Sequence, residues 1–194
     1  PPVTVQQRER ARRSRLISWV VLGLLVTDVV LIPGGLAAVG TLIALGAVLF
    51  ALICAALLNR LGSVTFAGLL LVGAISGAVT YATASVPQLS LVYLPAYDLF
   101  IISTVVAASV LPRRAVFPAA AFNVGLMVAD FIVQPHAADL KAAVATYGVS
   151  AMLERPIALQ VIVAVVAYLW VRGTDDAIRR ADRAEEIAAL EHSI

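Results

Sequence analysis

The most constraining feature of this chain is an apolar run that passes directly into a charged helix. Residues 156–171 are apolar on every face, and about 16 residues make about 24 Å of helix, which is short of the usual span but workable with Trp170 and Arg172 at the membrane edge. Residues 175–191 are rich in charge and in strong helix formers and contain neither Gly nor Pro. A membrane span followed by a soluble helix predicts the upstream part of a longer protein that ends in the stem of an output region.

Composition excludes a soluble domain. The chain is 61% hydrophobic and 13% charged, with a mean hydropathy of +0.97, whereas a soluble globule turns far more polar surface toward water. The net charge of +2 is mild and the sequence has no basic stripe, so nucleic-acid binding is not expected. The only cysteine, Cys54, lies inside an apolar run and excludes an internal disulfide. We therefore expect an all-α, polytopic helical bundle embedded in a lipid bilayer.

Six apolar segments are separated by turn signals and charges. Their positions predict transmembrane helices over residues 16–32, 36–58, 63–84, 91–111, 115–133 and 156–172. Pro95 is a candidate first residue of the fourth helix, because proline is favoured at that position. Residues 134–155 form the longest loop, in which residues 138–145 predict a short helix at the membrane surface.

The basic residues divide unequally between the two sides of these spans. Twelve of the 14 Lys and Arg residues fall on one side, and only Lys141 and Arg155 fall on the other. The positive-inside rule then predicts six crossings of the cell's inner (plasma) membrane, with both termini in the cytoplasm. The expected organisation is a basic segment over 1–15, the membrane domain over 16–172, and a cytoplasmic signalling helix or coiled-coil stem over 173–194.

Three carboxylates lie within the apolar spans: Asp28, Asp98 and Asp130. Each needs a partner, a wet cavity or a proton, because a charge in hydrocarbon costs at least ~2.5 kcal/mol on insertion scales. At about 1.5 Å per residue, all three lie about 5 to 10 Å below the same outer surface. They predict either a pocket for a small cationic or amine ligand, or structural pairs with polar neighbours, Lys141 or Arg155.

Other polar side chains lie in or near the same layer. Tyr81, Tyr93 and Tyr97 lie at the same level, where they would line such a pocket or, alternatively, form an aromatic belt at the membrane surface. Asn123 lies nearer the middle of the membrane, where it predicts a hydrogen bond between helices.

Two patterns concern helix association. Gly73 and Gly77 form a small-xxx-small motif, which predicts close packing within the bundle or, alternatively, a dimer face. In the tail, Ile187, Leu190 and Ile194 follow the spacing of a coiled-coil seam. The seam predicts a parallel dimer stem, and a single solvated helix is the alternative.

Motifs for catalysis and metal binding are absent from the sequence. His136 and His192 lie outside the spans, so no pair of intramembrane histidines can ligate a haem iron. The sequence has no metalloprotease motif, phosphate-binding loop or nucleophile elbow. We therefore expect neither an enzyme nor a resident metal or cofactor within these residues.

The sequence Arg172-Gly-Thr-Asp-Asp-Ala-Ile-Arg-Arg-Ala-Asp-Arg-Ala-Glu-Glu-Ile-Ala-Ala-Leu-Glu191 follows a series of short-looped crossings. In this architecture the chain resembles the six-helix membrane input modules of bacterial sensor histidine kinases, membrane-associated-sensor diguanylate cyclases and class III adenylyl cyclases. The resemblance implies a homodimer whose last membrane helix drives a cytoplasmic helix. Gly173 and Thr174 could form a hinge at this joint, ending one helix and capping the next.

Three classes of function are compatible with these features. The first is a sensory or regulatory module that detects a ligand or a membrane state and transmits through its last span. The second is a small transporter or channel that uses the three acids as a path, although all three lie in one outer layer. The third is a structural subunit of a membrane assembly.

Overall fold

The computed structural model describes residues 5–35 and 39–191, and it is all-α. Side chains are described in these ranges except at 5–9, 31–35, 39–41, 179, 182 and 185–191. In chain order the elements are α1 (Val5–Gly35), α2 (Val39–Arg60), α3 (Val64–Ala84), the 3₁₀ segment η1 (Leu91–Leu99), α4 (Phe100–Val110), the 3₁₀ turn η2 (Arg113–Ala115), α5 (Val116–Val133) and α6 (Ala138–Glu191). The predicted all-α bundle with six helices is confirmed.

Five helical stretches of the described chain are long and apolar enough to cross a membrane. They are Leu42–Arg60, Val64–Ala84, Leu91–Val110, Arg113–Val133 and Ala138–Ile178. The remaining predicted span, residues 16–32, lies in α1, which also includes the basic segment as helix from Val5 onward. Large apolar side chains such as Phe50, Ile132 and Trp170 are exposed on these helices. So much exposed apolar surface suits contact with lipid better than contact with water.

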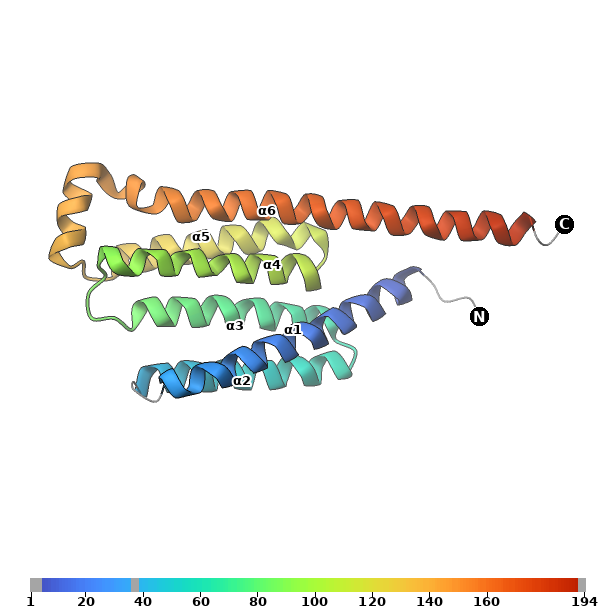
Figure 1. Cartoon of the computed structure of the whole chain (residues 1–194), viewed down its shortest axis with the longest axis horizontal. Coiled ribbons are helices and arrows are strands. Elements are labelled where there is room, and N and C mark those ends of the chain that lie inside the picture. Colours follow the sequence, from blue (N-terminus) through green and yellow to red (C-terminus); the bar gives the residue numbers. More distant parts are fainter. Residues whose placement is uncertain (1–4, 36–38, 192–194) are drawn as a thin grey trace.

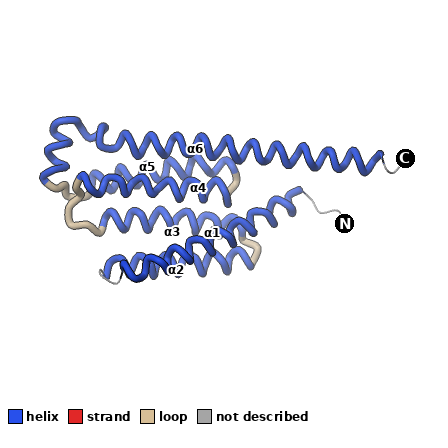
Figure 2. Tube along the Cα trace, in the orientation of Figure 1, coloured by secondary structure: helices blue, strands red, loops and turns tan. Residues whose placement is uncertain are grey.

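The helices lie side by side, and α6 is much longer than the others (Figure 1). α3 packs between α2 and α4, α6 packs against α4 and α5, and α1 crosses α2 while also contacting α3 and α4. Most of the connections are short, as Figure 2 shows. The start of α1 and the far end of α6 lie at one end of the bundle, where α2 also turns into α3 and α4 into α5. We call this the basic end, because Arg60, Arg113 and Arg114 belong to those turns.

The last span begins earlier than the sequence predicts. The short helix expected over 138–145 is present, and Gly148 (φ 83°, ψ 161°) separates it from the long part of α6. Pro156 was expected to open the last helix, but it lies inside α6 and is buried. Membrane helices tolerate an internal proline because neighbouring groups can satisfy the freed carbonyl. Gly148, which adopts a conformation open essentially only to glycine, makes the corner instead.

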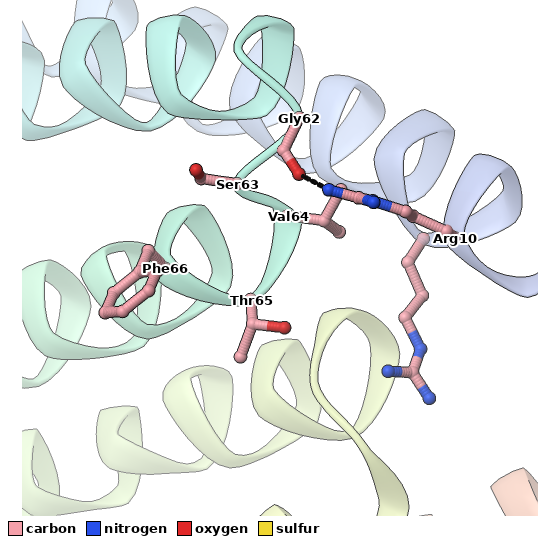
Figure 3. A pocket seen from close by; sticks show the side chains of 7 residues that line it. Arg10, Gly62, Ser63, Val64, Thr65 and Phe66 are labelled. Carbon is pink, nitrogen blue, oxygen red and sulfur yellow. Dashed lines mark hydrogen bonds between the residues drawn. The ribbon is translucent and has the colours of Figure 1, made fainter. Parts of the chain in front are cut away.

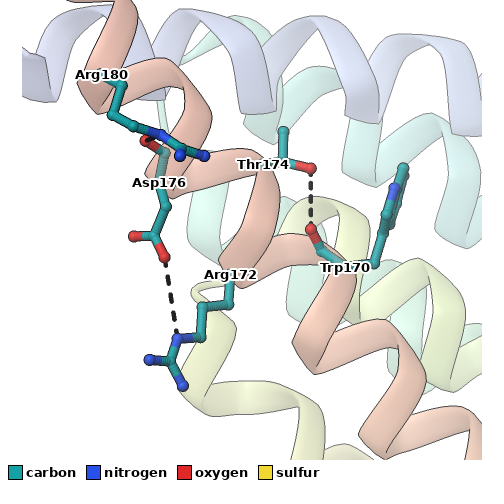
Figure 4. Close-up of polar contacts among 5 residues, drawn as sticks. All are labelled: Trp170, Arg172, Thr174, Asp176 and Arg180. Atoms are coloured by element: carbon teal, nitrogen blue, oxygen red, sulfur yellow. Dashed lines mark hydrogen bonds and ion pairs between the residues drawn. The ribbon is translucent and has the colours of Figure 1, made fainter.

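α6 is continuous past Gly173, so the hinge considered at this joint is absent. The Thr174 hydroxyl does not cap a new helix but donates to the Trp170 carbonyl at 2.9 Å, one turn back (Figure 4). Arg172 Nε lies 4.0 Å from Asp176 Oδ2, an ion pair between successive turns that is compatible with unbroken helix. The membrane span and the charged tail therefore form one rod.

The fourth span has an unexpected start. Residues Leu91–Leu99 form a 3₁₀ helix with Pro95 inside it, and α4 proper begins at Phe100. Asp98 therefore lies just before the α-helix and not in its first turn. The carboxylate of Asp139, at the start of α6, accepts the Leu91 backbone N–H at 3.1 Å and holds the beginning of the 3₁₀ segment.

Candidate functional site

Tyr97 and Asp98, neighbouring residues of η1, make two polar contacts that we together call the acidic cluster. Tyr97 contacts Asp130 of α5, which also contacts Gln134 just after α5, and Asp98 pairs with Arg155 of α6, so the two contacts include two of the three acids of the predicted spans. Within it, the buried Asp130 carboxylate accepts two hydrogen bonds, from the Tyr97 hydroxyl at 2.9 Å and from Gln134 Nε2 at 2.6 Å. Two donors satisfy both oxygens, so Asp130 can remain in the apolar layer.

Asp98 has a different kind of partner. Arg155 Nη2 lies 2.6 Å from Asp98 Oδ2, and the two side chains are 70% and 21% exposed. Of the three acids for which the sequence offers Arg155 as a structural partner, Arg155 reaches Asp98, its neighbour across the α6·η1 contact. Because Arg155 is largely exposed, this ion pair is also the most accessible part of the acidic cluster.

Asp28 stands apart from the acidic cluster. Its side chain is buried in α1, and it makes no hydrogen bond or ion pair within the part of the chain that the structure describes. α1 packs on α2, α3 and α4, whereas the acidic cluster is built from η1, α5 and α6. A ligand-binding role for Asp28 stays a prediction.

The tyrosines also separate. Tyr97 is fully buried in the acidic cluster, whereas Tyr93 and Tyr81 are exposed on the surface of the bundle. Their exposure is the arrangement expected of an aromatic belt. The predicted pocket residue Tyr97 is thus placed beside an acid, and Tyr93 is not buried with it.

The segment before η1 and the segment after α5 are hydrogen-bonded to each other next to residues of the acidic cluster. Leu89 N–H donates to the Pro135 carbonyl at 2.9 Å, and Ala137 N–H donates to the Leu89 carbonyl at 2.8 Å. The His136 ring lies 4.7 Å from the Phe131 ring and its Nε2 is 2.8 Å from the Phe131 carbonyl. These contacts fix the end of α5, which carries Asp130, next to the start of η1, which carries Tyr97.

A second polar group, which we call the polar core, crosses the middle of the bundle. It consists of Ser76 of α3, Ser103 and Thr104 of α4, Asn123 of α5 and Gln160 of α6, all fully buried. Asn123 Oδ1 accepts from the Ser76 hydroxyl at 2.7 Å, and Asn123 Nδ2 donates to Thr104 Oγ1 at 3.0 Å. Thr104 in turn donates to Gln160 Oε1 at 2.7 Å, and Ser76 lies 2.7 Å from Ser103. The interhelical bond predicted for Asn123 is confirmed, and it extends over four helices.

Sequence reasoning missed the other members of the polar core. Ser76, Ser103 and Thr104 are common in membrane helices, where they often bond to their own backbone. Gln160 carried the stronger signal, since a glutamine amide in the middle of a span must find a partner. Through Gln160, α6, the helix that leaves the bundle, is hydrogen-bonded to α4 within the polar core.

The small-xxx-small motif of α3 makes no close contact with another helix of the described chain. Gly73 and Gly77 are both exposed, and a Cβ atom added at either would meet no atom within 4 Å. The described helices therefore do not use the close approach that the motif allows. Packing against another copy stays a prediction.

No protein-family model, curated protein or solved structure matches this chain. The fold and the two polar groups define its class on their own. It is a helical bundle of the membrane-protein type, whose longest helix contacts both the acidic cluster and the polar core.

The same substitution at Asp130, which is buried, and at Asp98, whose partner is largely exposed, tests how burial affects stability at these two sites. We expect Asp130→Asn to lower the free energy of unfolding by about 1 to 3 kcal/mol. The NH₂ group of the asparagine would replace one acceptor oxygen and would face either the Tyr97 hydroxyl or Gln134 Nε2, both of which donate to Asp130 in this buried site. Asp98→Asn should cost less than about 1 kcal/mol, because its partner Arg155 is largely exposed. Thermal and denaturant unfolding of the purified variants in detergent would measure both. Equal losses would show that the difference in burial does not control these two sites.

Proposed function

We propose that this chain is a membrane-embedded sensory or regulatory module that transmits through α6 to a cytoplasmic helix. The observation that carries the proposal is the continuity of α6 from Gly148 to Glu191, through the bundle and beyond it. A rigid helix can convey a small shift or rotation over its whole length, whereas a hinge would absorb it.

Three side-chain contacts attach the long part of α6, beyond Gly148, to the bundle at different heights. Arg155 pairs with Asp98 in the acidic cluster, Gln160 accepts from Thr104 in the polar core, and Asp175 lies 3.8 Å from Arg12 of α1. At ~1.5 Å per residue, the first and last of these attachments are about 30 Å apart. A ligand that breaks or tightens the Asp98–Arg155 pair would therefore bias the position of α6 at the basic end.

The contact with α1 occurs where α6 leaves the bundle. A cavity of about 90 Å³ lies there, lined by residues of α1, α4 and α6 that include Arg12, Trp170 and Asp175. We propose that Arg12 and Asp175 hold one of two positions of α6.

We also propose how the protein is oriented in the membrane, what it associates with and what it detects. The basic end faces the cytoplasm of a cell with this protein in its plasma membrane, because most of the basic residues gather there. The chain acts as a homodimer through α6 and the tail positions Ile187, Leu190 and Ile194. The side chains of the first two, and all of Ile194, lie outside the described residues. The input is a small cation or amine at the acidic cluster, where Asp98 is partly accessible.

Single-cysteine crosslinking in membranes tests both the dimer and the transmission. With Cys54→Ser as background, cysteines at Ile187, Leu190 and Ile194 should crosslink more than one at Glu186, which lies off the predicted seam. Arg155→Ala should then change the yield at the seam positions, and adding Gly173→Pro should abolish that change because proline breaks the helix. A membrane-impermeant thiol reagent applied to intact cells should not label these cysteines.

Several outcomes would contradict the proposal. Equal crosslinking at all four positions would contradict the predicted seam. Labelling from outside the cell would contradict the cytoplasmic location of the tail. If Arg155→Ala left every yield unchanged, α6 would not couple the acidic cluster to the tail.

A further inference from the structure

A cavity at the basic end lies between α1 and the start of α3. It has a volume of about 460 Å³ and is lined by Arg10 and Arg13 of α1, by Gly62 and Ser63 of the α2–α3 turn, and by residues 64–66. Figure 3 shows Arg10 reaching the turn, with Thr65 and Phe66 on the first turn of α3. Two guanidinium groups therefore line one concave surface.

The turn that forms one wall is held in place by backbone geometry. Gly62 (φ 80°) ends α2, with its N–H donating to the Asn59 carbonyl at 3.0 Å and the Ser63 N–H donating to the Leu58 carbonyl at 2.9 Å. This pair of bonds is a Schellman motif, and its left-handed position favours glycine. The Arg10 guanidinium donates to the Gly62 carbonyl, so α1 is attached to the turn. The cavity is thus preformed by the fold.

Its lining is suited to an anion with several oxygens. Guanidinium groups donate charge-assisted hydrogen bonds, and phosphate can accept more than one of them. The cavity also reaches the start of α3, where the Ser63 side chain makes no capping hydrogen bond. Backbone N–H groups of a helix start add a favourable dipole to the charge of the arginines.

The surroundings of the cavity are those of a membrane surface. The apolar spans Leu42–Arg60 and Val64–Ala84 meet at this turn, so the cavity opens where hydrocarbon gives way to headgroups. Beside it, Leu61 is 80% exposed and Phe66 is 68% exposed. A bound molecule would therefore meet basic groups and apolar side chains together.

We infer that this cavity binds the phosphate of an acidic membrane phospholipid, with its acyl chains along the apolar surface near Phe66. The binding site is separate from the acidic cluster and does not depend on the proposed transmission. Acidic lipids are enriched in the membrane leaflet that basic segments face. The lipid would join α1 to α3 beside the exit of α6.

Competition between two lipids tests the site in the full chain. Native mass spectrometry of the protein in non-ionic detergent, with equal amounts of dioleoyl phosphatidic acid and dioleoyl phosphatidylcholine, should show about tenfold more bound phosphatidic acid. A tenfold ratio corresponds to ~1.4 kcal/mol, the lower end of what one hydrogen bond to a charged group contributes.

Thr65 provides a variant that should fold. Thr65→Asp places a carboxylate in the cavity but at a helix start, where a negative charge favours the helix. We expect it to reduce phosphatidic acid binding about tenfold, since like charges repel at close range. Thr65→Asn should bind like the parent. The double variant Arg113→Gln/Arg114→Gln removes two charges from the same end outside the cavity and should also bind like the parent.

The opposite results would overturn the inference. Equal binding of the two lipids, an unchanged Thr65→Asp variant, or an equal loss in the Arg113→Gln/Arg114→Gln variant would mean that this cavity does not select the headgroup. Inorganic phosphate at tenfold excess should not displace phosphatidic acid, because it lacks the apolar contacts. Displacement would identify a site for free phosphate in place of a lipid.

Discussion

We expect Asn123→Leu to lower the free energy of unfolding by about 2 to 3 kcal/mol, because hydrogen bonds between membrane helices average about 0.6 kcal/mol and stranded buried groups add to that loss. Asn123 accepts one hydrogen bond from Ser76 and donates to Thr104 and to the Phe100 carbonyl, so leucine removes all three. Leucine has the same number and branching of side-chain heavy atoms as asparagine, so the substitution leaves no cavity that would add to this loss. Unfolding of the purified protein in detergent would measure it.

Ser109 provides the matched control. Its hydroxyl donates only to the Val105 carbonyl within α4, so Ser109→Ala should change stability by less than about 0.5 kcal/mol. Ser76→Ala combined with Asn123→Leu should cost less than the sum of the single losses, because both remove the same bond. Additive losses would show that Ser76 and Asn123 are not coupled.

Two glycines of α6 should respond in opposite directions to alanine. Gly148→Ala is expected to cost about 1 to 3 kcal/mol, because its backbone lies in a region that alanine does not adopt without strain. Gly173→Ala should stabilise by about 0.5 to 1 kcal/mol, because Gly173 lies in a helix interior with open space around it. Denaturant unfolding of the two variants would compare them in one helix.

Two results would contradict these expectations for Gly148 and Gly173. A gain in stability at Gly148 would mean that the corner between the short helix and the long part of α6 is not required. A loss at Gly173 would indicate a bend at the joint to the tail, and it would weaken the rod on which the proposed transmission depends.

Several structural features were predictable because they depend on nearby residues. The apolar runs located the helices, since a run of about 20 apolar residues already specifies a span. The turn between the second and third spans followed from the turn signals that separate the predicted spans, and the bond of Asn123 followed from the need to satisfy a buried amide. The short helix that begins at Ala138 was also visible in the loop sequence.

Other features required the tertiary structure. Sequence reasoning named Arg155 as a partner but could not choose Asp98, which lies 57 residues away along the chain. It expected Pro156 to open a helix that actually begins after Gly148, and it left the continuity at Gly173 open. In each case the outcome depends on neighbours that a local pattern does not contain.

By itself, the sequence determined that this protein is a bundle of apolar helices, that its basic residues gather at one end, and that three acids need special surroundings. Only the tertiary structure decided that Asp130 pairs with Tyr97 and Asp98 with Arg155, that Asp28 lies apart, and that Gly73 and Gly77 make no close helix contact within the described chain. The physical reason is rotation about the helix axis. A helix that is apolar on all sides can turn without changing its hydropathy, so side-chain packing and polar pairing between helices choose the orientation.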